Sequence, residues 1–273
     1  MSTTTYSVSL AGVGPVDVTV AEQGTGQPFL LLHGGGGPPT VSSFAELFSS
    51  AHPARVISPI HPGFGGTPRP EALNTVPQLA ALYAALLDLL ELQDVTVVGN
   101  SIGGWIAAEI GLIESPRVRG IVIIDGAGIE VPGHPVADFF SLTLDQVFQL
   151  SYHNPEPFRF DPTSLPPPAQ AIAAGNRAAL AVYAGSGMTD PSLRERLATM
   201  ETPTLVLWGD SDRMVDPDYG RAYAAAIPRS RFQLLQDTGH MPQIETPDQV
   251  LRAIWACVET DFSSVPGRRP TPD

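Results

Sequence analysis

The stretch from Val95 to Gly104, Val-Thr-Val-Val-Gly-Asn-Ser-Ile-Gly-Gly, constrains the fold of this chain more than any other. A β-branched run typical of a strand ends at Gly99, and an apolar, alanine-rich segment typical of a helix begins just after Ser101. A strand that turns sharply into a helix brings its two arms together, so the positions two residues either side of the serine favour glycine. The Gly-x-Ser-x-Gly pattern therefore predicts a strained serine, with its hydroxyl presented to solvent and the helix amides directed at the same point.

Strand and helix patterns alternate along most of the chain, which predicts an α/β fold with a wound, mostly parallel sheet of eight strands flanked by helices. A continuous apolar run such as Phe29–Leu32 is typical of a strand that is covered on both faces. Besides the strand that ends at Gly99, strand patterns occupy Tyr6–Leu10, Val16–Ala21, Phe29–Leu32, Ala54–Ile60, Val118–Ile124, Pro203–Trp208 and Arg231–Leu235. Besides the helix after Ser101, helix patterns occupy Phe44–Ser50, Val76–Leu92, Tyr219–Ile227 and Pro247–Glu259.

The segment after the sixth strand has a different character. From about Gly126 to Met200 it contains no strand-like run, its prolines are frequent and its aromatic residues are concentrated. We expect a mostly helical insertion at residues 127–200, set into a core formed by residues 1–126 and 201–262. The proline- and arginine-rich tail at residues 263–273 is expected to be flexible.

The charge pattern excludes several classes of function. The net charge is −13 and the basic residues are scattered singly, which argues against a nucleic-acid partner or an anionic membrane surface. The chain contains no lysine, which excludes Schiff-base catalysis, a pyridoxal-phosphate anchor, a Walker lysine and a Ser-Lys dyad. No group of His and Cys residues has metal-ligand spacing. We therefore expect a small-molecule substrate, no cofactor and no metal.

The sequence also argues against a membrane location. The longest apolar stretches, near Leu79–Leu90 and Ile102–Ile113, are interrupted by Asp88 and Glu109 and are too short to span a bilayer. The first ten residues lack the basic and apolar regions of a signal peptide. These observations predict a soluble cytoplasmic protein.

A serine hydroxyl is a poor nucleophile unless a base lies within hydrogen-bond reach and a third group orients that base. His240 follows the last predicted strand, and Asp212 follows the strand before it. Because the carboxyl ends of parallel strands meet at one edge of a sheet, we expect both to lie near Ser101. Two other carboxylates remain open as the orienting acid, Asp210 and Asp125, the latter at the end of the sixth strand.

These motifs together resemble the α/β-hydrolase fold family over about residues 6–259. The matching pieces are Leu32-His33-Gly34-Gly35, Pro62-Gly63-Phe64-Gly65, Gly99-Asn100-Ser101-Ile102-Gly103-Gly104, Trp208-Gly209 through Asp212-Arg213, and Gly239-His240 with Glu245 and Pro247. The resemblance implies Ser101 as nucleophile, His240 as general base and Asp212 as its orienting acid. It also implies an oxyanion hole from the backbone N–H groups of Gly35 and Ile102, and a helical cap formed by the insertion.

The resemblance and the aromatic insertion suggest which residues surround a substrate. The candidate substrate-binding residues are Gly34, Asn100, Phe139, Phe140, Tyr152 and Met241. His134 and His153 are further candidates for the wall of the pocket, whereas His33 is expected to stabilise the glycine loop. The aromatic residues of the insertion predict an apolar pocket.

Three functions fit these features. The first is a serine hydrolase that cleaves a small, largely apolar carboxylic ester, thioester or lactone through an acyl-enzyme. The second is hydrolysis of a carbon–carbon bond, because Asn100-Ser101, the glycine loop, Gln243 and Glu245 resemble meta-cleavage product hydrolases. Met241 stands where those enzymes usually carry Trp, and Arg177 is the candidate for their substrate-binding arginine. The third is a small-molecule receptor on the same fold that turns over slowly or not at all.

Overall fold

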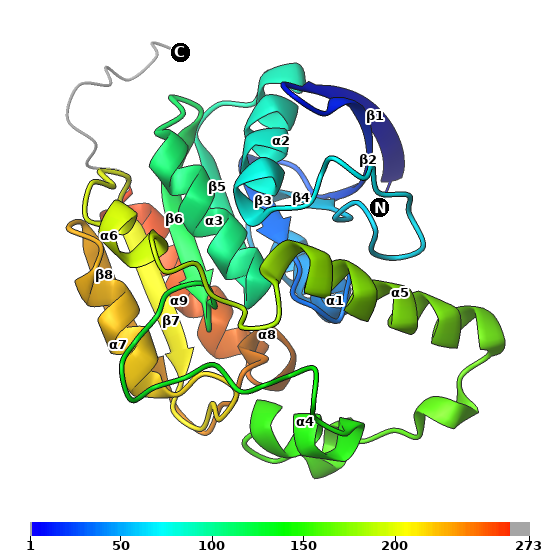
Figure 1. The fold of residues 1–273 in the computed structure, drawn as a ribbon. Helices are drawn as coiled ribbons and strands as arrows, with labels where there is room; N and C mark the ends of the chain where they lie inside the picture. Colours follow the sequence, from blue (N-terminus) through cyan, green and yellow to red (C-terminus); the bar gives the residue numbers. More distant parts are fainter. Residues whose placement is uncertain (1, 263–273) are drawn as a thin grey trace.

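The computed structural model describes residues 2–262, and the tail expected at residues 263–273 lies outside the described residues. Within residues 2–262, eight strands form one sheet: β1 (Ser2–Leu10), β2 (Gly14–Gln23), β3 (Gln27–Leu32), β4 (Ala54–Pro59), β5 (Val95–Asn100), β6 (Val118–Ile124), β7 (Thr204–Gly209) and β8 (Ser230–Leu235). Their order is β1-β2-β4-β3-β5-β6-β7-β8 (Figure 1). The pairs β1–β2 and β2–β4 are antiparallel, and the other neighbouring pairs are parallel. The predicted mostly parallel, eight-stranded sheet is confirmed.

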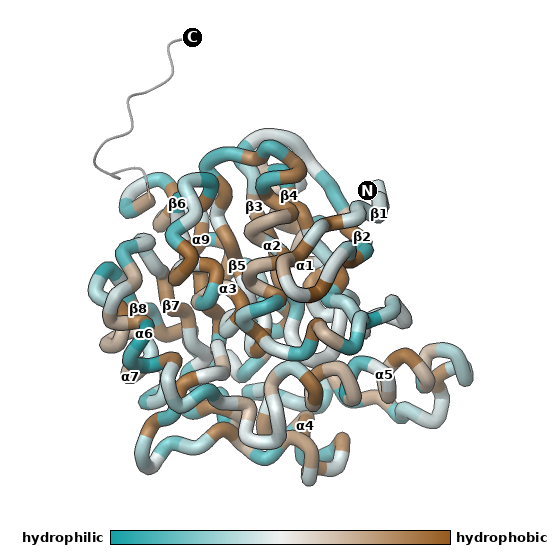
Figure 2. The backbone as a smooth tube through the Cα atoms, turned by 45° about the horizontal axis from the view of Figure 1, so that its top comes forward, coloured by the Kyte–Doolittle hydropathy of each residue, from teal (hydrophilic) through white to brown (hydrophobic). Residues whose placement is uncertain are grey.

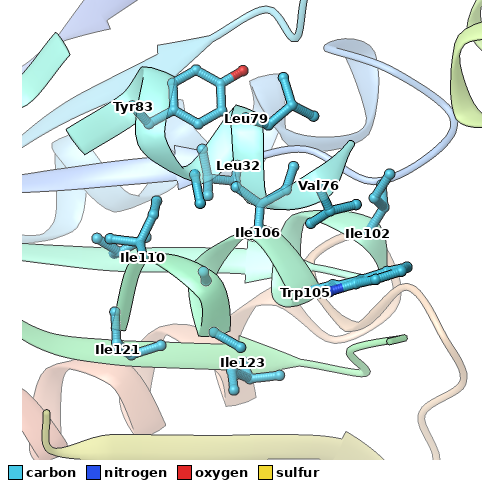
Figure 3. Close-up of a cluster of buried hydrophobic side chains, with 14 of the residues drawn as sticks. Leu32, Val76, Leu79, Tyr83, Ile102, Trp105, Ile106, Ile110, Ile121 and Ile123 are labelled. Atoms are coloured by element: carbon cyan, nitrogen blue, oxygen red, sulfur yellow. The ribbon is translucent and has the colours of Figure 1, made fainter. Parts of the chain in front are cut away.

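Helices cover both faces of this sheet. One face packs against α2 (Val76–Leu89), α3 (Ile102–Ile113) and α7 (Pro217–Ala225), and the other packs against α1 (Pro39–Ala51) and α9 (Pro247–Thr260). Figure 3 shows part of the first layer, where side chains of α3 lie between α2 and β6. Hydrophobic stretches run through the central strands and the helices packed on them, and hydrophilic stretches gather in the outer loops (Figure 2).

The apolar strand runs follow from this double cover. Along β3, Leu30 and Leu32 belong to the cluster on the α2–α3 side, whereas Phe29 and Leu31 belong to the cluster on the α1–α9 side. Successive side chains of a strand point to opposite faces, so a strand buried on both faces has no place for polar alternation.

Some element bounds differ from the sequence prediction. Helix α1 begins at Pro39 rather than at Phe44, because proline is favourable in the first turn of a helix, where its missing N–H leaves no bond unmade. Helix α2 ends at Leu89, three residues earlier than predicted, and Glu91 has a φ of 51°. At its start, Thr75 and Gln78 form a reciprocal capping box.

The segment between β6 and β7 carries α4 (Leu144–Ser151), η1 (Glu156–Phe158), η2 (Pro162–Ser164), α5 (Pro167–Ala184) and α6 (Leu193–Leu197). Helices α4 and α5 lie beyond the carboxyl ends of the parallel strands (Figure 1). The two ends of the segment meet, because the Asp190 N–H donates to the Gly128 carbonyl at 2.7 Å. Arg196 of α6 pairs with the buried Glu109 of α3 at 2.7 Å. Among the helices of residues 2–262, none has both the length and the apolar composition that crossing a bilayer requires.

Candidate active site

Ser101 occupies the turn between β5 and α3 with φ 57° and ψ −119°, so the strain predicted from the sequence is confirmed. A Cβ at Gly99 would lie 2.0 Å from the Gly103 carbonyl oxygen, which shows that the two arms of the turn touch. A Cβ at Gly103 would lie 2.4 Å from the Leu32 carbonyl oxygen of the neighbouring strand. Both glycines are therefore required by close backbone approach.

His240 and Asp212 meet beyond the ends of β8 and β7. Nδ1 of His240 lies 2.8 Å from Oδ2 of Asp212, and both residues are buried. The second oxygen of Asp212 accepts the Met214 and Val215 N–H groups at 2.8 and 3.1 Å, which fixes the carboxylate. An ionised Asp212 can only accept, so Nδ1 of His240 carries the proton in this bond and Nε2 keeps its lone pair.

Ser101 and His240 both line a cavity of about 390 Å³. Gly35 and residues of the insertion complete its wall. Within residues 2–262 no hydrogen bond joins the Ser101 hydroxyl directly to His240. Catalytic hydrogen bonds of this kind are often long until substrate is present. The arrangement can therefore supply a hydroxyl and a proton acceptor to one bound molecule.

The other two carboxylates have different surroundings. Asp210 accepts the Asp237 and Thr238 N–H groups at 3.1 and 3.2 Å, so it braces the loop before His240 rather than the imidazole. Asp125 accepts the Gly209 N–H at 2.9 Å through one oxygen, while its other oxygen is buried without a hydrogen-bond partner.

Asp125 nevertheless lies close to the histidine–aspartate pair. Ligand atoms of Asp125, Asp212 and His240 all lie within 4.8 Å of one another. Two carboxylates at this separation would repel by on the order of 3 kcal/mol at an effective dielectric constant of about 20. Burial, followed by the charge of Asp212, raises the pKa of Asp125 well above its ordinary value. Of the two carboxyl groups near His240, Asp125 is thus poorly suited to carry a negative charge.

The backbone N–H groups of Ile102 and Gly35 are the two expected oxyanion donors. Ile102 is the first residue of α3, whose early N–H groups have no partner inside the helix, and Gly35 lies on the cavity wall. Neither N–H is bonded to an acceptor in the described part of the chain. Both are available to an oxygen atom that carries negative charge.

Comparison with known proteins identifies the family. Residues 29–253, which are more than half of the chain, match the Alpha/beta hydrolase family. The chain belongs to the alpha/beta hydrolase family. The protein is therefore a hydrolase, as the sequence motifs predict.

This hydrolase is similar in sequence or in structure to several known proteins. It is 27% identical to Lipase 1 of Psychrobacter immobilis over 84% of this chain and 76% of that protein. It is 26% identical to the 2-hydroxymuconate semialdehyde hydrolase of Pseudomonas putida over 85% of this chain and 87% of that protein. Among solved structures, a thermophilic esterase from Thermogutta terrifontis has a TM-score of 0.75 at 25% identity and covers 94% of this chain and 98% of its own.

The hydrolase cavity includes some of the residues expected to contact substrate and excludes others. Phe139, Tyr152 and Met241 line it, whereas Gly34, Phe140 and Asn100 do not, and neither do His134 and His153. The Asn100 side chain instead donates to the Ile124 and His240 carbonyl groups at 3.2 and 3.0 Å and accepts from Gln243 at 3.1 Å. The Asn100 side chain therefore holds the backbone near Ser101 and His240 in place and does not line the cavity.

Sequence reasoning missed most of the apolar wall. Leu144, Val147, Phe148 and Ser151 of α4 all line the cavity at helical spacing, a signal that was present in the sequence. Leu180 and Met188 follow later in the insertion, while Met214 and Val215 come from the loop after β7. Loop residues such as these carry no periodic signal.

Three buried side chains support the glycine loop. Nδ1 of His33 donates to the Gly34 carbonyl at 2.8 Å, and Nε2 accepts the His61 N–H at 3.1 Å. Nε2 of His61 donates to the His33 carbonyl at 3.0 Å, and Nδ1 accepts the Tyr83 O–H. Each imidazole therefore gives one proton and accepts one, which requires both to be neutral. The expected role of His33 in stabilising this loop is confirmed.

Because His33 and His61 are neutral in the folded protein, we expect the protein to become less stable as the pH falls. Burial lowers the pKa of His33 to about 4 and that of His61 well below its ordinary value of 6.5. The unfolded chain binds these protons near pH 6.5 and the folded chain does not, so stability is lost as pH falls from 6.5 towards 4. For His33 the loss amounts to about 3 kcal/mol.

The measurement is the free energy of unfolding in urea at several pH values between 4.5 and 7. We expect the wild-type value to fall with pH, and the variant His61→Gln to be less stable at pH 7 but to show a shallower fall. A wild-type value that is constant over this range contradicts the expectation.

Among residues 2–262, two groups of side chains have the composition of a metal site. Besides Asp125, Asp212 and His240, the ligand atoms of His134, Asp216 and Asp218 lie within 4.8 Å of one another. In the second group His134 is bonded to Asp216 at 2.8 Å, and Asp216 also accepts the first N–H groups of α7. These bonds occupy the Asp216 carboxylate and Nδ1 of His134.

Proposed function

We propose that this hydrolase cleaves a small, largely apolar carboxylic ester, thioester or lactone through an acyl-enzyme on Ser101. The observation that carries the proposal is the shared cavity: the strained serine and the Asp212-oriented histidine face one space whose walls are mainly apolar. Apolar side chains hold the acyl or alcohol group, and few polar atoms compete for the carbonyl group.

The proposed reaction proceeds in two halves. The Ser101 oxygen attacks the carbonyl carbon while Nε2 of His240 takes the hydroxyl proton. The N–H groups of Gly35 and Ile102 donate to the resulting oxyanion, and each such donor is worth about 10²–10³ in kcat. The leaving alcohol or thiol takes the proton from His240, and the acyl group stays on Ser101. A water molecule then gives a proton to His240 and attacks the acyl-enzyme, which releases the acid and returns the proton to Ser101.

Hydrolysis of a carbon–carbon bond is the second candidate, and Arg177 is the observation that favours it. Arg177 is a cation on the cavity wall, and its Nη2 donates to the Phe139 and Phe140 carbonyl groups at 3.0 and 2.6 Å. Its Nε and Nη1 have no hydrogen-bond partner among residues 2–262. These N–H groups suit the carboxylate of a ring-cleavage dienoate. The relative named 2-hydroxymuconate semialdehyde hydrolase agrees with this candidate.

A substrate panel tests the proposal. We expect a fluorophosphonate probe to label the wild type but not Ser101→Ala, and p-nitrophenyl esters of short to medium chain length to be hydrolysed. A ring-cleavage dienoate that is hydrolysed much faster than every ester favours the second candidate. A wild type that is neither labelled nor active overturns both and favours a small-molecule receptor.

A further inference from the structure

The carboxyl end of α4 accepts hydrogen bonds from both loops that carry the proposed base and acid. The His240 N–H donates to the Ser151 carbonyl at 2.7 Å. The N–H of Arg213, the residue after Asp212, donates to the Leu150 carbonyl at 3.0 Å, and its Nη1 donates to the Gln149 carbonyl at 2.8 Å. The last turn of α4 thus satisfies its free carbonyl groups with the site loops.

Glu245 strengthens this junction from the other side. One oxygen of its carboxylate accepts the Gly239 N–H at 2.7 Å and the His153 N–H at 3.2 Å, and the other accepts the Asn154 N–H at 3.0 Å. The two backbones are in contact here, since a Cβ at Gly239 would lie 2.3 Å from the Ser151 carbonyl oxygen. A single carboxylate therefore joins the residue before His240 to the insertion.

Helix α5 makes the equivalent contact with the glycine loop. Asn176 is buried, its Nδ2 donates to the Gly36 carbonyl at 3.1 Å, and its Oδ1 accepts the Gly65 N–H at 2.8 Å. The Tyr183 hydroxyl donates to the Pro62 carbonyl at 2.9 Å. A Cβ at Gly35 would lie 2.7 Å from the Leu180 side chain. The peptide that carries one proposed oxyanion donor is thus packed against the insertion.

We propose that Glu245 and Asn176 are positioning residues through which the insertion holds both halves of the catalytic machinery. Glu245 fixes the backbone that carries His240, and Asn176 fixes the loop that carries the Gly35 N–H. The inference rests on the proposed acyl-enzyme chemistry at Ser101. A displacement of about 1 Å in a catalytic group can cost on the order of 10² in rate. Loss of either contact therefore slows the chemical step even for a substrate too small to touch the insertion.

Kinetic measurements with a small substrate distinguish the positioning role of Glu245 and Asn176 from a role in substrate binding. We expect Glu245→Gln and Asn176→Ala each to lower kcat for p-nitrophenyl acetate by about 10- to 100-fold, with KM changed less than about threefold. The rate of Ser101 labelling by a fluorophosphonate should fall by a similar factor. Glu156→Gln and Gln170→Ala are matched controls, because both alter exposed side chains of the insertion whose bonds stay within it. Both controls should keep wild-type kcat.

A second variant addresses the case in which Asn176→Ala fails to fold. Asn176→Asp keeps an acceptor for the Gly65 N–H but replaces the donor to the Gly36 carbonyl with an oxygen. We expect it to be less stable than the wild type but folded at the assay temperature, because the bond to Gly65 remains, and still to lose kcat for the acetate.

The outcomes distinguish this inference from the proposed function. Folded variants that keep wild-type kcat and labelling rate for the acetate, and lose activity only towards longer esters, overturn the positioning role alone. A wild type that is inert to both the probe and the esters overturns the proposed function, and the positioning role with it.

Discussion

Replacement of Ser101 by alanine is expected to lower kcat for a p-nitrophenyl ester by on the order of 10⁵- to 10⁶-fold. In the proposed mechanism the hydroxyl oxygen forms the acyl-enzyme, and Ser101 is the residue of the strained turn that lies on the cavity wall. Residual hydrolysis would come from the oxyanion donors acting on water. The measurement is steady-state turnover, together with mass spectrometry of the fluorophosphonate-treated protein.

The structure offers a matched control for this substitution. Ser141 is an exposed serine whose hydroxyl donates to Asp138 and to no other group within residues 2–262, so Ser141→Ala should keep full activity. The fold should survive in Ser101→Ala, because the Cβ that bears the backbone strain is unchanged. A folded Ser101→Ala protein with activity within tenfold of the wild type contradicts the acyl-enzyme mechanism.

Asp212→Asn is expected to lower kcat by about 10⁴-fold. The carboxylate accepts a hydrogen bond from Nδ1 of His240, and in the proposed mechanism it compensates the imidazolium that forms when Ser101 is deprotonated. An amide can present an N–H in place of that oxygen, which favours the wrong tautomer and removes the charge. The two backbone N–H groups that hold Asp212 leave the amide little freedom to find another geometry.

Asp125→Asn is the informative comparison, because both carboxyl groups lie near His240. Burial and the charge of Asp212 raise the pKa of Asp125 and so disfavour its charged form, which an amide of the same shape also lacks. We expect its kcat to stay within a few-fold of the wild type. The reverse result, with Asp125→Asn inactive and Asp212→Asn active, would assign the acid role to Asp125.

The same variant has an expected effect on stability. A carboxyl group whose folded pKa is raised destabilises the fold increasingly as pH rises above its unfolded value, here 3.8. Asn does not titrate, so Asp125→Asn should unfold at a higher urea concentration than the wild type at pH 7, and the advantage should shrink towards pH 4. An advantage that is the same at both values contradicts a raised pKa.

The sequence was most informative where a local steric rule acts. The glycines around Ser101 are required because two backbone segments touch them, and that requirement is visible as a pattern within five residues. The apolar runs of β3, β5 and β6 are equally readable, since burial on both faces leaves no polar positions. Fold class and sheet type therefore followed from the sequence.

The candidate site could be predicted only in part, because only some of its features depend on local steric rules. The edge of the sheet where Ser101, Asp212 and His240 gather follows from strand direction. Which carboxyl group touches His240 depends instead on how the loops after β6 and β7 are folded. Asn100 lies next to the serine in sequence, yet its side chain turns beneath the site to Ile124 and His240.

The sequence by itself thus determined the α/β architecture, the strained serine and the set of candidate partners, because these depend on short-range sterics and on periodic burial. Only the tertiary structure decided that Asp212 rather than Asp125 is hydrogen-bonded to His240, and that Phe148 and Leu180 line the cavity while Phe140 does not. It also revealed that Glu245 of the core and Asn176 of the insertion join these two parts of the chain. A hydrogen bond such as that between Asn176 and Gly36, which are 140 positions apart, depends on how separate loops meet in space, and no local pattern of residues predicts it.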